Sequence, residues 1–568
     1  MPHRAVPSFV DLFTPKLVTV LREGYGLGHL RSDIIAGLTV AIVALPLSMA
    51  IAIASGVSPD RGLYTAIVGG FIISALGGSR FQIGGPAGAF IVLVLATVTA
   101  HGLDGLILAT FLSGAMLLVV GFLRLGTFIK YIPFPVTVGF TAGIAVIIFA
   151  SQIRELLGLT LASEPGELVH KLQALWAVRS TITPLAVVVS FGTIAIILAT
   201  RRFRPHWPGM LIAVAAAAGA TGLLDLPIAT IGSKFGGIPN GLLAPMLPDL
   251  SVDKIVAVLP AALSFALLGG IESLLSAVVA DNMSGRRHRS NCELVAQGLG
   301  NMASALFGGF CVTGTIARTA TNVRAGARGP VSGMLHAVFL LLFMLVAAPL
   351  ASYIPLAALA GVLALVSWNM FEKREFAGLV RASWGDAVVV LSTFLLVIFR
   401  DLTEGILVGF ALGTLLFLHR MAQAVEVQTG MPMVAEDQAD HVAGEVRTHY
   451  DPSVASDPDI VLHKISGAFF FGSAANVAIA LDHLAERPKA FVLDFSSVPL
   501  LDSTAASTIE SFVRKAERRH ATVHIAGATP GVQRVLQSHG VDALHVQFSA
   551  TAAEALTVAR RAVLAAQR

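Results

Sequence analysis

The chain has 568 residues, of which 55% are hydrophobic and only 13% are charged; its mean hydropathy is +0.77 and its formal net charge is +4. Soluble domains carry about 25% charged residues, so most of this chain is expected to lie in a lipid bilayer. The basic residues are scattered between apolar runs and form no stripe, which argues against a nucleic-acid partner.

Residues 1–32 precede the apolar part of the chain and hold no apolar stretch with a small-residue cleavage site, so we expect a cytoplasmic segment and no removable signal peptide. From 33 to 422 the hydropathy predicts a transmembrane domain with about fourteen apolar runs. The runs fall near 34–55, 63–76, 87–100, 106–123, 134–150, 182–199, 210–224, 255–280, 294–307, 315–322, 331–348, 356–370, 387–398 and 406–418. Lys and Arg are concentrated in alternate connections, which predicts that these connections and both termini are cytoplasmic.

Two short polar breaks interrupt this pattern, at 82–90 and at 308–319. The helical sequence 87–100 after the first break is about 14 residues, or roughly 21 Å, whereas the hydrocarbon core of a bilayer is about 30 Å thick. It is therefore expected to cross only half of the bilayer. Breaks at corresponding positions of two halves of a membrane chain predict a substrate site between opposed half-helix N-termini.

The residues at these two helix starts are expected to form an anion cradle. Each start offers about half a positive charge and several free N–H donors. Glycine lets the backbone approach a ligand closely, and proline in the first helical turn costs no hydrogen bond. The predicted substrate-binding residues are Ser48, Gly85, Pro86, Ala87, Gly314, Thr315, Ile316, Ala317 and Arg318.

Arg318 adds a full charge one turn into the second half-helix. Placing it in the membrane costs on the order of 3 kcal/mol unless a partner compensates, and an anionic substrate would be that partner. The alternative is an arginine that pairs with a backbone carbonyl or reaches toward the cytoplasm. Ser48, two residues after Pro46, is expected to give the first run a polar edge beside the cradle; the alternative is a hydroxyl bonded to its own backbone.

Glu272 is the other costly group, since it lies midway along the apolar run 255–280. A carboxylate there needs a proton or a cation. Ser276 is one helical turn further on the same face and could supply an oxygen ligand. The alternative is a purely structural Glu272 that bonds to helix starts.

The chain becomes polar after Arg420, and 423–449 is expected to be a linker. A soluble domain is predicted over 450–565, with strands at 459–467, 490–497 and 522–526 and helices at 474–485, 503–519, 531–538 and 552–566. Alternating strands and helices predict a small α/β domain around a mostly parallel sheet.

Two sets of residues carry a family resemblance. AspSerThrAla at 502–505, after the predicted strand 490–497, resembles the helix-opening signature of a STAS domain, the module of bacterial anti-sigma-factor antagonists. The stretches 36–56, 62–70, 77–90 and 280–301 resemble the sulfate permease (SulP) group, also called solute carrier family 26. The resemblance implies an α-helical polytopic fold with roughly 14 spans in an inverted repeat, half-helices in spans 3 and 10, and a homodimer.

The same resemblance implies how the domain would move and couple. A core of spans 1–4 and 8–11 would move against a gate of spans 5–7 and 12–14. In sodium-coupled bicarbonate relatives an acid, a hydroxyl four residues later and backbone near the second break hold Na⁺. The matching residues here are Glu272, Ser276, Gly314 and Thr315, with Glu272 and Ser276 as the Na⁺ ligands. Proton coupling is the rival, and Glu272 would have to carry it because no acid lies between Asp33 and Asp60.

The predicted function is secondary active transport of a small anion of the sulfate, bicarbonate or dicarboxylate class across a bacterial inner membrane. Two alternatives stay open: an anion-binding sensor or scaffold that signals to a cytoplasmic partner through the STAS domain, and a nucleobase permease of the same fold. We expect no enzyme and no cofactor other than a coupling Na⁺, and Cys292 and Cys311, which lack CxxC spacing, are expected to be apolar fillers. Ser503 is either a phosphorylation site, as in antagonist proteins, or a helix N-cap.

Overall fold

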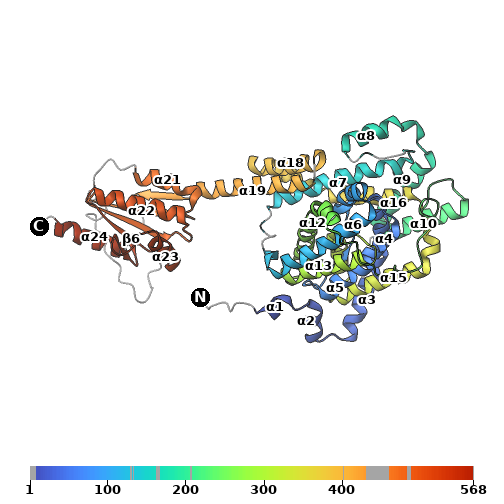
Figure 1. Cartoon of the computed structure of the whole chain (residues 1–568), viewed down its shortest axis with the longest axis horizontal. Helices are drawn as coiled ribbons and strands as arrows, with labels where there is room; N and C mark the ends of the chain where they lie inside the picture. The colour runs from blue at the N-terminus through green and yellow to red at the C-terminus, as the bar shows by residue number, and fades with distance from the viewer. Residues whose placement is uncertain are drawn as a thin grey trace. The chain divides into compact units, whose positions relative to one another are not determined.

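The computed structural model of the chain describes residues 8–127, 131, 133–161, 165, 167–204, 207–400, 402–429, 459–482 and 488–566. The chain divides into two compact units, Met1–Ala411 and Leu412–Arg568. The first is almost entirely helical and the second contains a sheet flanked by helices (Figure 1). Most of the predicted linker 423–449 and the first residues of the predicted domain 450–565 lie outside the described residues.

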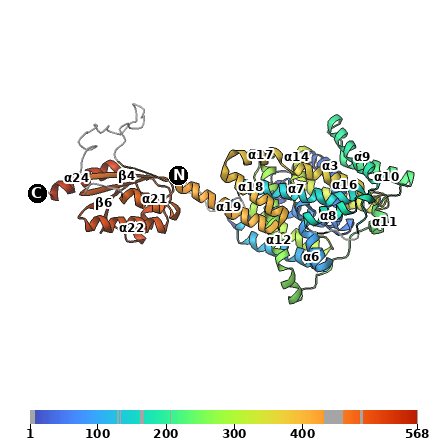
Figure 2. The same ribbon diagram turned by 90° about the horizontal axis from the view of Figure 1, so that it is seen from above.

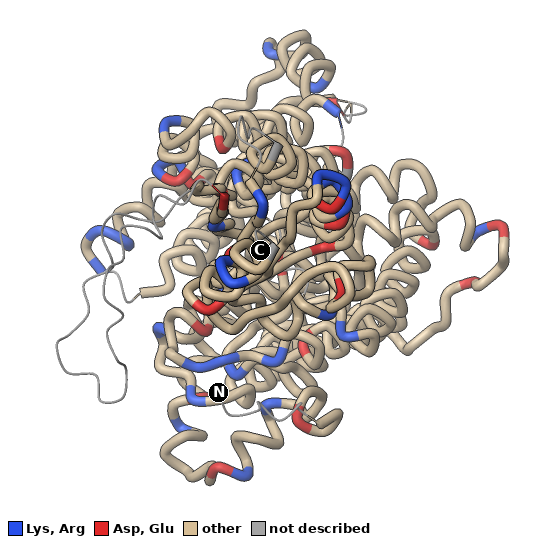
Figure 3. Tube along the Cα trace, turned by 90° about the vertical axis from the view of Figure 1, so that its left-hand side faces the viewer, with Lys and Arg blue, Asp and Glu red and all other residues tan. Residues whose placement is uncertain are grey.

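Each predicted apolar run coincides with helical structure. The helices are α3 (Leu27–Ala54), α4 (Pro59–Tyr64), the π-helical turn η1 (Thr65–Gly69), α5 (Gly70–Leu76), η2 (Gly88–Phe90), α6 (Ile91–Phe122), α7 (Phe134–Leu157), α9 (Pro184–Phe203), α10 (Gly209–Leu224), α12 (Val252–Ser284), α13 (Ser290–Leu306), α14 (Ile316–Arg324), α15 (Val331–Ala351), α16 (Leu356–Met370), α18 (Trp384–Phe399) and α19 (Leu402–Gln423). Within the described part, eight helices are long and apolar enough to cross a membrane. Charged residues of this unit lie mainly in connections and at helix ends. Over the whole chain, they are few among the uncharged majority (Figure 3).

Shorter helices without a long apolar run were not expected from the sequence. They are α1 (Phe9–Phe13), α2 (Lys16–Arg22), α8 (Leu168–Ala177), α11 (Ile231–Phe235) and α17 (Lys373–Ala382). Two of them, α8 and α17, are ten residues long and connect longer helices.

Two of the predicted runs, 87–100 and 106–123, fall almost entirely within η2 and α6. They are separated at Gly102, whose φ of 68° lies in the left-handed region that favours glycine. The helix that follows the first break therefore ends at Gly102, where the chain changes direction before the second run begins. Its counterpart after the second break, α14, is only nine residues long.

Glycines bring the long helices into backbone contact. A Cβ on Gly114 of α6 would lie 2.6 Å from the carbonyl oxygen of Gly298 of α13, and the reverse distance is also 2.6 Å. A Cβ on Gly37 of α3 would lie 2.6 Å from the carbonyl oxygen of Ser332 of α15. Lipid tails are as apolar as leucine, so close packing of small residues replaces the hydrophobic effect as the force between membrane helices. Helix α3 packs on α15, and α12 packs on α6. An inverted repeat relates these two pairs to each other, because α12 would correspond to α3 and α15 to the second part of α6.

The second unit contains a five-stranded sheet of β3 (Glu426–Thr429), β4 (Ile460–Ser466), β5 (Ala490–Ser497), β6 (Thr522–Ala526) and β7 (Val546–Ser549), in that order. Only β3 is antiparallel to its neighbour. Helices α21 (Phe471–Asp482), α22 (Ser503–Arg518) and α23 (Pro530–Ser538) belong to one face and α24 (Ala552–Ala566) to the other (Figure 2). The three predicted strands and four predicted helices are confirmed, except that 483–485 lie outside the described residues.

Two expectations for this unit need correction. The edge strand β3 is formed by residues that we assigned to the linker 423–449. The sequence did not reveal this strand, because a short, polar, exposed edge strand has no alternating apolar pattern. The N-cap of α22 is Asp502, whose Oδ1 accepts a hydrogen bond from Ala505 N at 2.9 Å. Ser503 is not the cap; it is the exposed first residue of the helix.

Candidate functional site

The two polar breaks meet inside the first unit and satisfy each other's backbone. Residues Gly84–Gly85 (β1) pair antiparallel with Thr313–Gly314 (β2), with Gly85 opposite Thr313. Thr315 N also donates to the carbonyl oxygen of Ile83 at 3.0 Å. Irregular backbone in a membrane domain requires such partners. The pairing holds the starts of η2 and α14 beside each other, as the sequence predicted for the cradle.

The crossing leaves no room for side chains at two positions. A Cβ on Gly85 would lie 1.7 Å from Nη1 of Arg318. A Cβ on Gly314 would lie 1.8 Å from Nε2 of Gln82. Real Cβ contacts are never this short, so a larger residue at either position would require the end of the Arg318 or Gln82 side chain to move.

Arg318 is buried at this crossing, with 1% of its surface exposed. Its Nη2 donates to Ser48 Oγ at 3.2 Å and to the carbonyl oxygen of Pro86 at 3.3 Å. Its Nε and Nη1 have no hydrogen-bond partner, and no carboxylate among the described residues pairs with it. A buried, unpaired guanidinium is costly, so two of its donor nitrogens are available for an anion. The hydrogen bond to the carbonyl oxygen of Pro86 also agrees in part with the alternative role, an arginine that pairs with a backbone carbonyl.

Ser48 faces the guanidinium from α3 and is fully buried. Its hydroxyl accepts from Arg318 and makes no hydrogen bond to its own helix within the described structure. Pro46 lies inside the same helix two residues earlier, where it removes one backbone donor. The structure therefore brings Ser48 to the predicted cradle.

The two helix starts differ in exposure. Gly85, Pro86 and Ala87 are buried, whereas Ile316 is 44% exposed and Ala317 is also exposed. Thr315 is the N-cap of α14, and its side chain makes no capping hydrogen bond to the first N–H groups of this helix.

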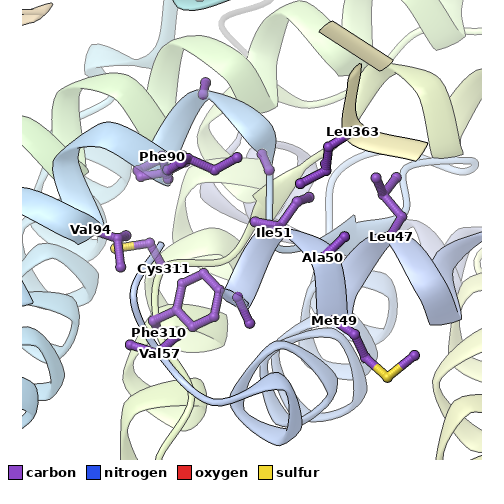
Figure 4. Close-up of a cluster of buried hydrophobic side chains, with 14 of the residues drawn as sticks. Leu47, Met49, Ala50, Ile51, Val57, Phe90, Val94, Phe310, Cys311 and Leu363 are labelled. Carbon is purple, nitrogen blue, oxygen red and sulfur yellow. The ribbon is translucent and has the colours of Figure 1, made fainter. Parts of the chain in front are cut away.

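Apolar side chains surround the crossing. Phe310 and Cys311, which precede β2, lie in one buried cluster with Ile51, Phe90 and Val94 (Figure 4). Cys311 Sγ is 3.5 Å from Thr110 Oγ1, and the cysteine fills space in this cluster. Low polarity around the site strengthens any electrostatic interaction with Arg318.

Several polar residues at the crossing were missed by the sequence reading. Ser273 Oγ lies 2.7 Å from Thr313 Oγ1 and accepts from Gly314 N at 3.3 Å. Asn322 Nδ2 donates to the carbonyl oxygen of Phe81 at 2.9 Å, and Ile83 N donates to Thr319 Oγ1 at 3.1 Å. The available signal was the spacing of small polar residues, at 273 and 276 on α12 and at 319 and 322 on α14, with Thr315 as the N-cap of α14.

The predicted cation set is only partly assembled. Ser276 is buried and donates to Thr319 Oγ1 at 3.0 Å, which links α12 to α14. Glu272 is partly exposed and makes no hydrogen bond or ion pair with any described residue, Gly314 and Thr315 included. The hydroxyl that contacts Gly314 belongs to Ser273, whereas Ser276 contacts Thr319 at the end of the second break. The role of Glu272, Ser276, Gly314 and Thr315 in cation binding stays a prediction.

These features define a polytopic helical membrane protein in which two backbone breaks meet around a buried arginine, with a C-terminal α/β domain. A family model described as the sulfate permease family matches residues 30–393, and a STAS domain model matches residues 451–555. The chain belongs to the sulfate permease family of anion transporters, and it carries a C-terminal STAS domain. This confirms the family expected from its sequence motifs.

Relatives of known sequence and structure agree with this assignment. YvdB of Bacillus subtilis (strain 168), by its name a candidate sulfate transporter, is 39% identical over 522 residues, covering 91% of this chain and 95% of that protein. The bicarbonate transporter BicA of Picosynechococcus sp. is 31% identical over 527 residues, covering 90% of each. The structure of the murine solute carrier 26 family member A9 anion transporter, in an inward-facing state, superposes with a TM-score of 0.81 at 17% identity, covering 99% of this chain and 96% of that one, which shows a shared fold.

Proposed function

We propose that this protein is a secondary active transporter of a small anion, which binds at the crossing of the two breaks. The observation that carries the proposal is Arg318, a buried guanidinium with two unpartnered donor nitrogens and no carboxylate partner among the described residues. An anion entering there would replace a missing counter-charge, and the N-terminus of α14 would add free N–H donors.

Alternating access is supported by which elements hold the site. Ser48, Pro86, Ser273 and Arg318 all belong to the helices assigned to the core, namely α3, the segment before α6, α12 and α14. The gate helices pack against this body through α16 and α10 on α3 and through α7 on η2. Beside the cradle, a Cβ on Gly88 would lie 3.2 Å from Ile148 Cδ1 of α7 and 3.5 Å from Met370 Sδ of α16. Movement of the core as one body past α7 and α16 would carry the bound anion from one side to the other.

The substrate class is a small oxyanion: sulfate, bicarbonate or a dicarboxylate such as fumarate. Backbone donors and a guanidinium recognise carboxylate and sulfate oxygens alike. Coupling to Na⁺ or H⁺ would use Glu272, a membrane carboxylate that has no partner among the described residues. The protein would work as a homodimer in a bacterial inner membrane, with both termini in the cytoplasm and the STAS domain available to a protein partner.

One experiment tests the proposal and names the substrate. Purified full-length protein is reconstituted in liposomes, and uptake of labelled sulfate, bicarbonate and fumarate is measured with and without a Na⁺ gradient at two pH values. We expect accumulation of one anion class that depends on Na⁺ or on pH. Arg287→Ala, on an exposed connection, serves as a control with unchanged uptake. Anion binding without transport under any gradient would overturn the proposal and favour the sensor function.

A further inference from the structure

A groove with almost wholly apolar walls lies between α7 and α16, and none of its lining residues belongs to the cradle. Its volume is about 400 Å³, and its walls include Ala145 and Phe149 of α7 and Trp368 of α16, with Lys373 at one end. The hydroxyl of Ser367, which also lines it, donates to the carbonyl oxygen of Ala364 at 2.8 Å. That hydroxyl is satisfied within its own helix, so Lys373 supplies the polar group at the end of an otherwise apolar groove.

Exposed tryptophans place this region at a membrane boundary. Trp368 is 63% exposed and Trp384 is 78% exposed, and they flank α17 on its two sides in the sequence. Tryptophan is enriched at the headgroup level of membranes because its ring is apolar and its N–H is polar. The Lys373 ammonium lies 3.1 Å from the centroid of the Trp368 ring, a cation–π contact that holds the charge at the mouth of the groove.

Helix α17 presents basic residues beside that mouth. Phe376 anchors the helix, since its ring lies 5.4 Å from that of Phe371 and 5.2 Å from that of Phe394 on α18. Lys373, Arg374 and Arg381 are exposed and form no ion pair with a described residue. The two acids nearby, Glu372 and Glu375, leave the segment with a net charge of +1 (three basic minus two acidic residues).

We propose that this groove binds an anionic phospholipid, with one acyl chain between α7 and α16 and the phosphate on Lys373 and Arg374. The surrounding solvent of these helices is lipid, so an acyl chain is the apolar molecule present to fill the groove. Basic side chains beside a gap between membrane helices recognise anionic headgroups. The site lies on gate helices and is independent of the anion that the protein transports.

The test measures lipid retention by the purified full-length protein. Native mass spectrometry after incubation with phosphatidylglycerol or phosphatidylcholine compares the natural chain with the double variant Lys373→Gln, Arg374→Gln. Each cation near a headgroup contributes about 1 kcal/mol, so phosphatidylglycerol retention should fall on the order of 30-fold in the double variant. Arg286→Gln with Arg287→Gln removes two exposed basic residues elsewhere and should leave retention unchanged.

Fluorescence provides a second readout should the double variant not fold. Phosphatidylglycerol brominated on its acyl chains should quench the natural chain more than brominated phosphatidylcholine does, and Trp368→Phe should remove that difference. Equal retention of both lipids, or equal quenching with and without Trp368, would overturn the proposal. Crosslinking of two chains through Trp368→Cys in the presence of phosphatidylglycerol would also overturn it, because a second copy would then occupy the groove.

Discussion

The guanidinium of Arg318 lies where a side chain on Gly85 would be: a Cβ on Gly85 would lie 1.7 Å from Nη1 of Arg318. The first break therefore supplies a bare backbone, and the second supplies the guanidinium that lies against it. The position of the Arg318 guanidinium therefore depends on the absence of a side chain at residue 85.

Gly85→Ala should displace the guanidinium without unfolding the protein, because the neighbour that must move is the end of a flexible side chain. Loss of one or two charge-assisted hydrogen bonds should weaken anion binding by about 10- to 100-fold. Isothermal titration of the purified variant with the transported anion measures this. Gly269→Ala is the matched control, since its Cβ would meet nothing closer than 3.6 Å. Equal losses in both variants would show that any added methyl in the core disturbs binding.

Arg318→Ala should abolish measurable binding and uptake, since it removes the only full positive charge that we place in the cradle. Arg318→Lys keeps the charge, but a single ammonium cannot contact Ser48 and Pro86, as Nη2 does, and also present the separate Nε and Nη1 donors to an anion, so partial loss is expected. Uptake and binding are measured on the same preparations. Unchanged affinity in Arg318→Ala would remove this residue from the site.

Ser48→Ala should have a smaller effect than Arg318→Ala, because the hydroxyl only orients the guanidinium. Loss of a hydrogen bond to a charged group costs about 1.5–3 kcal/mol, which corresponds to a decrease in affinity on the order of 10- to 100-fold. Ser48→Thr should retain most of the affinity, because it keeps the hydroxyl. An inactive Ser48→Thr together with an active Ser48→Ala would contradict the hydrogen-bond role.

Glu272→Gln should leave anion binding in place and remove the dependence of uptake on Na⁺ or pH. The amide keeps the size of the side chain and cannot be ionised. Uptake is measured across Na⁺ concentrations and pH values in proteoliposomes. A variant whose uptake responds to Na⁺ and pH as the natural chain does would exclude Glu272 from coupling.

The STAS domain should lose stability in acid through His463. This residue of β4 is fully buried, its Nδ1 lies 3.0 Å from Thr429 Oγ1, and burial lowers the pKa of its imidazole to about 4. The unfolded chain binds the proton near pH 6.5, so this contribution to stability is complete above that pH and is lost as the pH falls toward 4. The loss amounts to roughly 3 kcal/mol.

Hydrogen exchange of the full-length protein, corrected for the intrinsic effect of pH, measures this change in the amides of β4 and β5. His463→Leu should flatten the dependence between pH 7 and 4.5. The exposed His520 is the control position, and His520→Asn, which tolerates its φ of 60°, should retain the dependence of the natural chain. A His463→Leu protein with the same acid sensitivity as the natural chain would refute the prediction.

The apolar helices and the α/β domain were predictable because their signals are local. Run length and hydropathy located the long helices of the described residues, and the short stretch 87–100 ends just before the left-handed Gly102, where the helix changes direction. The STAS strands β4, β5 and β6 were predicted from their β-branched and aromatic residues. The edge strand β3 was not, because its pairing with β4 depends on residues far along the chain.

The sequence by itself determined that this chain enters a membrane, that two breaks interrupt it and that one break carries an arginine, since composition and periodicity record burial in lipid directly. Only the tertiary structure decided that Gly85 pairs with Thr313, that Ser48 and Pro86 accept hydrogen bonds from the guanidinium, and that Ser273 rather than Ser276 contacts Gly314. These contacts join residues more than 200 positions apart or depend on which side of a helix faces the crossing. Hydropathy contains neither kind of information, because it averages over a helix and its neighbours in sequence.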